Sequence, residues 1–251
     1  MGKFFTKTIK PQFTATTIIQ SNKTHLPFSA GDLMVDWTAI DMPKGASKLI
    51  DVTAVIKGQD GVAQTARDLV LYFAKATETG AAPGSLGTVN ATANGFGYFN
   101  QLIGTAIVDS SDFKIGLDYL SMASNGHGAA SNQIPGIVLQ GHENHNATNN
   151  KIYLGVIAGG SADFSFETGV QTTEAVSAST SPVTLTVDGT DARKCFDVGD
   201  VVGAMDDAAI GTVTNIASGT EFTVDAVGGA LADDDEIVNL TPLTIILSFE
   251  R

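Results

Sequence analysis

Short apolar runs with a period of two constrain this chain more than any other feature of its sequence. Three of them stand in the first half, DLMVDWTAID (32–41), KLIDVTAVIKG (48–58) and RDLVLYFAKA (67–76), and turn-forming residues bound each one. This alternation of apolar and polar residues is typical of strands in an antiparallel sheet with one buried face. We therefore predict that the three runs form a β-meander.

The composition agrees with an all-β fold. Only 16% of the 251 residues are charged and 27 are glycine, whereas exposed helices would bring more Glu, Lys and Leu. A chain of this length can bury the core of one large domain or of two smaller ones. The predicted fold class is all-β, with a β-sandwich-like main domain and a small inserted β-barrel-like domain near the C-terminus.

The middle of the chain alternates strand-like runs with bland polar stretches. Residues 77–97, TETGAAPGSLGTVNATANGFG, are predicted to form a long loop that orders against a neighbouring subunit, and 121–136 form a second Gly-rich connection. The run at 98–111 fits a short helix and a strand equally well. GIVLQ (136–140) and KIYLGVIAG (151–159) are predicted to be two strands of a hairpin with a long polar loop.

The chain becomes strongly acidic after Phe166. Residues 166–240 contain 14 acidic and 2 basic residues, so this segment carries −12 of the chain's net charge of −13. Five strand-like runs lie within it: PVTLTVDG, DVVGAM, AIGTVTNIA, TEFTVDAV and EIVNL. They suffice for a small five-stranded barrel or sandwich. We expect its core to contain Val201, Val202, Ile210, Val213, Ile216, Phe222 and Val224.

The last run, LTPLTIILSFER (240–251), is predicted to be a strand of the main sheet, beside 151–159. The predicted domains are therefore a main domain of residues 1–171 plus 241–251, with an N-terminal arm, and an inserted acidic domain of residues 172–240. Burying so many carboxylates would require cations that this chain lacks, so we expect the inserted domain to face outward.

The N-terminal sequence indicates neither export nor membrane insertion. MGKFFTKTIKPQFT lacks the apolar region and cleavage site of a signal peptide, and no run approaches 18 apolar residues. We expect a protein that stays soluble in a cytoplasm. Gly2 and Thr6 fit the N-myristoylation pattern, but that pattern needs a eukaryotic host, so a flexible or docking arm is favoured. Cys195 is the only cysteine, which excludes an intrachain disulfide.

Two clusters contain residue types that bind metals. His142, Glu143 and His145 lack the spacing of two His four apart on a helix that zinc proteases use. The run DDDE (233–236) could bind calcium, but it lacks alternating ligands and a central glycine. A solvated loop and a turn before a strand are the favoured interpretations. We predict no metal and no cofactor.

No group of residues indicates catalysis or nucleotide binding. Arg193 and Lys194 would lower the pKa of the Cys195 thiol, yet no nearby His offers a base, which favours a half-buried structural cysteine. No helix follows the glycines of GVIAGG or NGFG, so neither forms a phosphate-binding turn. We predict no catalytic residues and no enzymatic activity.

The charge balance disfavours nucleic acid as a partner, because 14 basic residues face 27 acidic ones. Residues 1–75 differ from the rest, with nine basic residues against six acidic ones. This part could face an acidic protein surface, although ordinary scattered surface lysines explain the excess equally well.

One segment resembles a known class of proteins. FDVGDVVGAMDDAAIGTVTNIASGTEFTVDAVGGALADDDEIVNL, with its VGDVV, IGTVT and DDDEIVN elements, is similar to a segment of virion structural proteins of tailed bacteriophages, particularly of marine and cyanobacterial hosts. The resemblance covers about a fifth of the chain. It implies a small β module carried on capsid or tail proteins, and it brings no catalytic residue.

These observations favour a non-enzymatic capsid decoration or cement protein, located on the capsid surface of the virion after assembly in the bacterial cytoplasm. The expected partners are the major capsid protein and further copies of the chain, with a homotrimer favoured because the long bland loops would order against neighbours. A tail or baseplate component is the alternative within this class. A sandwich that binds glycans or a host receptor through Trp37, Tyr98 or Tyr119 is the alternative from another class.

Overall fold

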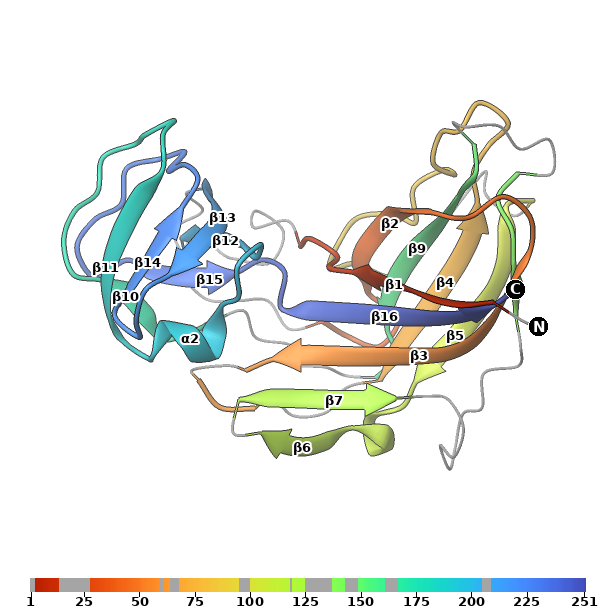
Figure 1. Cartoon of the computed structure of the whole chain (residues 1–251), viewed down its shortest axis with the longest axis horizontal. Helices are drawn as coiled ribbons and strands as arrows, with labels where there is room; N and C mark the ends of the chain where they lie inside the picture. Colours follow the sequence, from red (N-terminus) through yellow and green to blue (C-terminus); the bar gives the residue numbers. More distant parts are fainter. Residues whose placement is uncertain are drawn as a thin grey trace.

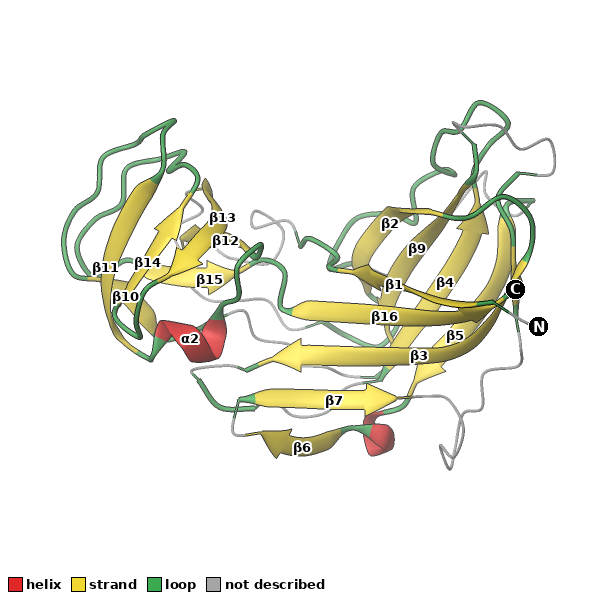
Figure 2. Cartoon of the chain, viewed as in Figure 1, coloured by secondary structure: helices red, strands yellow, loops and turns green. Residues whose placement is uncertain are grey.

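In the computed structural model the chain is built almost entirely from antiparallel strands, which confirms the all-β prediction (Figures 1 and 2). The structure describes residues 3–13, 28–58, 61–63, 68–94, 100–117, 119–124, 137–142, 149–160, 167–204 and 209–251. The strands form two open sheets and a closed barrel.

The first sheet, called here the β16 sheet, has the order β1-β16-β3-β7-β6, and β8 pairs with the start of β3. Its strands are β1 (Phe4–Ile9), β3 (Ser47–Lys57), β6 (Lys114–Leu117), β7 (Leu120–Ser124), β8 (Val138–Leu139) and β16 (Leu243–Glu250). Buried and half-buried residues alternate along all of β16, so this strand presents one face to the core.

The second sheet, the β9 sheet, has the order β2-β9-β4-β5. It contains β2 (Leu33–Asp41), β4 (Leu69–Lys75), β5 (Leu102–Val108) and β9 (Lys151–Ala158), and the short 3-10 helix η1 (Ser110–Asp112) follows β5. Side chains of both sheets meet in one hydrophobic core, where Leu71 and Phe73 of β4 join Ile245 and Leu247 of β16. The main domain is therefore a β-sandwich.

The structure corrects several predicted strand pairings. The runs at 32–41, 48–58 and 67–76 are strands, but they alternate between the two sheets and form no meander. β8 and β9 also lie in different sheets, so 136–140 and 151–159 are not a hairpin. β16 pairs with β3 and β1 rather than lying beside β9. Period two identifies a strand, but it does not identify the partner strand.

Two further stretches are strands: one for which the sequence left helix and strand open, and one expected to be a flexible or docking arm. Residues 102–108 within the run at 98–111 form β5, and the predicted N-terminal arm contains β1, which pairs with β16 over its whole length. In β1 the side chains of Phe5 and Ile9 face inward. Lys7 occupies the inward position between them and obscures the apolar alternation in the sequence.

The Gly-rich stretch after β4 packs on its own chain rather than requiring a neighbour. Leu86 is buried over β2 and β9, and it fits there because Gly155 has no Cβ, which would lie 2.3 Å from Leu86 Cδ1. The Tyr153 hydroxyl donates to Gly80 O at 3.0 Å, and burial, with a smaller contribution from Asp41, raises the pKa of this phenol. Within the described residues 77–94, this ordering removes one argument for a trimer.

The acidic segment forms a closed six-stranded barrel, with the order β10-β11-β14-β13-β12-β15 (Figure 1). Its elements are β10 (Val170–Thr172), β11 (Val183–Gly189), the single-turn helix α2 (Ala192–Cys195), β12 (Val201–Ala204), β13 (Ala209–Ile216), β14 (Glu221–Val224) and β15 (Glu236–Asn239). The sequence predicts five of these strands; the sixth is β10, which has three residues and joins β11 to β15.

The barrel has a hydrophobic core of its own, distinct from that of the sandwich. The ring centroids of Phe196 and Phe222 lie 5.1 Å apart within this core, and both side chains are fully buried. Of the predicted core residues, Val202, Ile210, Val213, Phe222 and Val224 are buried there and Ile216 packs against them. Val201 packs instead against the sandwich core.

The strands β12 and β15 form a wall that the barrel shares with the sandwich. On β15, Ile237 faces the barrel core and Val238 faces the sandwich core. On β12, Val202 faces the barrel core and Val201 packs against the sandwich core. The barrel strands run from Val170 to Asn239, and cutting at 172–240 would remove Val238 and Leu240 from the sandwich core. The independent folding of the two domains stays a prediction.

Candidate functional site

Of the two clusters with metal-binding residue types, the structure describes the DDDE run in full but only His142 of the other. His142 is half-buried and its backbone N–H bonds to Asn149 O, while Glu143 and His145 lie outside the described residues. Across the described ranges, no three His, Cys, Asp or Glu side chains are grouped as ligands.

Two of the four carboxylates of the DDDE run accept hydrogen bonds from the backbone of the barrel segment. Asp235 is 3% exposed, and its Oδ2 accepts a hydrogen bond from the backbone N–H of Ala232 at 2.6 Å. Glu236 Oε1 accepts from the backbone N–H groups of Thr168 and Gly169. Asp233 and Asp234 are exposed, and Asp234 has a left-handed φ of 63°. The run is thus a tight turn that leads into β15.

We expect the melting temperature to be the same with and without a chelator, because Asp235 and Glu236 already have backbone donors. Differential scanning fluorimetry with EDTA checks this, and magnesium-saturated EDTA is the control for ionic strength. A fall of several degrees with EDTA alone would mean that a bound cation contributes to folding.

Cys195 is a structural residue of the barrel core. Its side chain is fully buried, and its Sγ–H donates to Thr168 O at 3.4 Å. The neighbouring Arg193 pairs with Asp191, the N-cap of α2, through a contact of 2.6 Å between Nη2 and Oδ2. The predicted cysteine was half-buried; the fully buried position leaves the thiol no access to a substrate.

The Asp191–Arg193 pair gives a small pH dependence with a defined sign. Hydrogen bonds from Arg193 lower the pKa of Asp191 from its ordinary 3.8 to about 2. The pair therefore stabilises the fold above pH 3.8, and this contribution is lost as the pH falls through about 2.

Asp191→Asn keeps a capping side chain and removes the charge, so we expect it to be slightly less stable than the parent at pH 6 and nearly equal to it at pH 1, below the folded-state pKa of Asp191. Asp191→Ala also loses the cap and should cost about 1 kcal/mol more than Asp191→Asn. Urea unfolding at both pH values measures this. A pH-independent difference between parent and Asp191→Asn would contradict it.

Of the three aromatic residues considered for glycan stacking, the two that the structure describes lie in different sheets or their turns and do not form a platform. Trp37 donates from Nε1 to Gly84 O at 2.8 Å, and its ring packs beside Leu86. Tyr119 lies in the turn between β6 and β7, in the other sheet, and Tyr98 is outside the described residues. The described aromatics therefore give the glycan alternative no support.

The junction between barrel and sandwich contains two ion pairs. Asp200, whose side chain is fully buried, accepts from Lys10 Nζ at 2.6 Å, and Asp197 accepts from Lys57 Nζ at 2.5 Å. The second oxygen of Asp200 also accepts from the backbone N–H of Asp197 and from Asn239 Nδ2. Two lysines of the sandwich thus hold two carboxylates of the barrel beside the shared wall.

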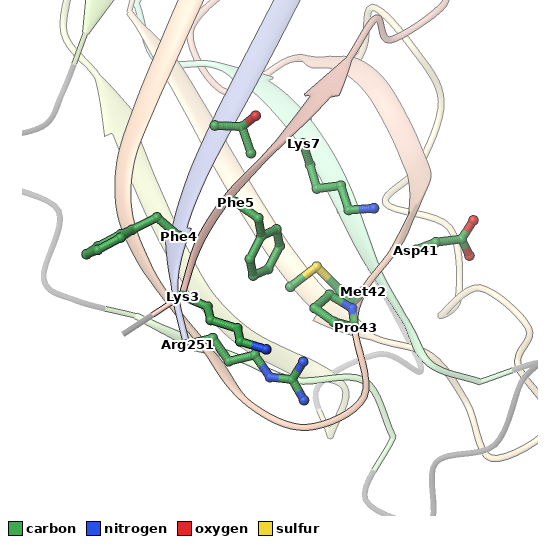
Figure 3. A pocket seen from close by; sticks show the side chains of 9 residues that line it. Lys3, Phe4, Phe5, Lys7, Asp41, Met42, Pro43 and Arg251 are labelled. Atoms are coloured by element: carbon green, nitrogen blue, oxygen red, sulfur yellow. The ribbon is translucent and has the colours of Figure 1, made fainter. Parts of the chain in front are cut away.

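A groove of about 550 Å³ lies along β1 and the end of β2, away from the barrel (Figures 1 and 3). Phe5, Met42 and Pro43 form its apolar part, and Lys3, Lys7 and Arg251 supply cations. Figure 3 shows Lys3 and Arg251 side by side and Lys7 on the side of Asp41. The one acidic side chain of this lining is Asp41, whose Oδ1 lies 3.9 Å from Lys151 Nζ. We call this feature the β1 groove.

Sequence reasoning found neither the junction nor the β1 groove as a site. Lys10 and Asp200 are 190 residues apart, so no local pattern connects them. For the groove a signal did exist, the basic, aromatic stretch KFFTKTIK and the excess of cations in residues 1–75. Residue Arg251, at the other end of the chain, completes the groove through the pairing of β1 with β16.

No protein family, curated protein or solved structure matches this chain. No helix in the described part of the chain is long and apolar enough to cross a membrane.

Proposed function

We propose that the chain is a non-enzymatic structural protein of a tailed-bacteriophage virion, which decorates the outer capsid surface. The β-sandwich docks on the assembled major capsid protein, and the acidic barrel faces the solvent. The separation of charge between the two parts of the molecule carries this proposal.

The acidic residues are concentrated in the barrel segment, whereas the lysines and the arginine of the β1 groove lie at the end of the sandwich where both termini emerge (Figure 1). A surface with this much negative charge favours solvent over a protein interface. The closed barrel has no free strand edge that could pair with another chain, as expected for a domain exposed to solvent. The junction lysines fix the barrel to the sandwich.

Quantitative mass spectrometry of purified particles tests the proposal, with the major capsid protein as the internal standard. A copy number close to that of the capsid lattice is expected for a decoration protein. A handful of copies per particle would assign the chain to the tail or baseplate instead, and its absence from particles would overturn the virion role.

We keep the homotrimer as part of this proposal, because decoration at the local symmetry axes of a capsid favours a symmetric oligomer. Light scattering at micromolar concentration, alone and with capsids, measures it. A monomer in both samples would contradict it.

A further inference from the structure

The outer edge of β1 is open in the described part of the structure. β1 is the terminal strand of the β16 sheet, and it exchanges backbone hydrogen bonds with β16 alone. Lys3 and Arg251 exchange both backbone hydrogen bonds, at 3.1 and 2.9 Å. Bonded and non-bonded pairs alternate in an antiparallel ladder, so Phe4, Thr6 and Thr8 direct their N–H and C=O groups to the outer edge.

The β1 groove gives this edge a preference for negative charge. Among the described residues, neither Lys3 nor Lys7 has an ion-pair partner, and Asp41 lies next to Lys151. Glu250 lies opposite Phe4, on the sheet face away from the core, because its neighbour Phe249 is fully buried. The groove therefore combines an excess of positive charge with the apolar surface of Phe5, Met42 and Pro43.

We propose that β1 and its groove bind an extended, acidic segment of a partner protein, which adds as a strand to the free edge. Backbone groups of Phe4, Thr6 and Thr8 would supply the hydrogen bonds, and Lys3 and Lys7 would pair with carboxylates on the added strand. Strand addition gives affinity through the backbone, and the charge selects the partner.

A second copy of this chain fits the edge poorly. Pairing of β1 with β1 of another copy would bring Lys3 and Lys7 of both copies together, and like charges across a strand pair destabilise it. A lysine that faces inward from an edge strand, as Lys7 does, is a known device against such pairing. The acidic strands of the barrel are already paired on both sides, so they have no edge to offer.

This inference deepens the proposed function, because it names the surface through which the sandwich would dock. The two can fail separately: the particle count tests the virion role, whereas binding of a peptide to the purified chain tests the β1 edge.

The probe is a capped peptide of the same length as β1 in which Glu alternates with Val and Thr, and the matched control has Lys in place of Glu. Amide exchange and chemical shifts of the full chain are followed by NMR. With saturating acidic peptide, exchange at Phe4, Thr6 and Thr8 is expected to slow by at least about tenfold. The Lys peptide should give little protection, and added salt should weaken the binding of the acidic peptide.

Thr6→Pro removes one outward N–H without touching the ladder to β16, so it should abolish the protection, while Thr6→Val should retain it. Unchanged Trp37 fluorescence shows that each variant is folded. The double variant Lys3→Glu with Lys7→Glu should reverse the preference, so that the Lys peptide gives more protection than the acidic peptide. Equal binding of both peptides, protection at another strand edge, or full binding by a folded Thr6→Pro variant would overturn the proposal.

Discussion

Replacing Phe222 by Ala is expected to unfold the barrel at low denaturant while the sandwich stays folded. Phe222 is fully buried against Phe196, and removing a buried Phe side chain costs about 3–5 kcal/mol. A domain of the barrel's size has a total stability of about 4–10 kcal/mol. The substitution would therefore remove much of the barrel's free energy of unfolding. It would affect the sandwich only through the wall of β12 and β15.

The chain contains a natural probe for each domain. Trp37, the only tryptophan, lies in the sandwich, and Cys195, the only cysteine, is fully buried in the barrel. Labelling of Cys195 by a thiol reagent in urea thus reports opening of the barrel, and Trp37 fluorescence reports unfolding of the sandwich.

For Phe222→Ala we expect the midpoint of Cys195 labelling to fall and the Trp37 midpoint to stay close to that of the parent. Phe222→Leu should show the same pattern with a smaller shift, which covers the case in which the Ala variant does not fold. Phe73→Ala in the sandwich core is the matched control and should lower the Trp37 midpoint. Coincident shifts of both probes in all three variants would show one cooperative unit instead of two domains.

The sequence predicted which segments are strands much better than how they pair. The runs at 32–41, 48–58 and 67–76 closely match β2, β3 and β4, because each has one face in the core and period two records that burial. Their assignment to alternate sheets depends on contacts far apart in the sequence, such as those of β4 with β9. β10 escaped detection because three residues are too few to show a period.

The barrel core was predictable for the same reason, whereas the shared wall was not. Val201 and Val202 are adjacent in β12 and therefore point to opposite faces, but the sequence does not show that the sandwich covers the outer face, where Val201 packs. The bland stretch at 77–97 was expected to need a neighbouring subunit. Residues 77–94 instead pack on the outer face of the β9 sheet, through Leu86 and the space above Gly155.

Asp200→Ala is expected to lower the stability of the barrel and the sandwich together, unlike any substitution in either core. The carboxylate is fully buried and accepts three hydrogen bonds, from Lys10 Nζ, the Asp197 N–H and Asn239 Nδ2. Lys10 is 32% exposed and can turn to solvent, but the buried Asn239 amide and the Asp197 N–H lose their acceptor, which costs about 1–3 kcal/mol for each group left unsatisfied. Cys195 labelling should shift most, since two of the three donors belong to the barrel, and the Trp37 midpoint should follow.

The lysine side of this pair is the matched comparison. Lys10→Met leaves the donors of Asp197 and Asn239 in place, but the fully buried charge of Asp200 loses its cation, so this variant should also lower both midpoints. The double variant measures the coupling directly: if the pair joins the domains, the two losses are not additive in the Trp37 midpoint. If the losses are additive, or if Asp200→Ala leaves the Trp37 midpoint unchanged, Asp200 only closes the Asp197–Asp200 turn. The wall of Val201 and Val238 would then hold the domains together without it.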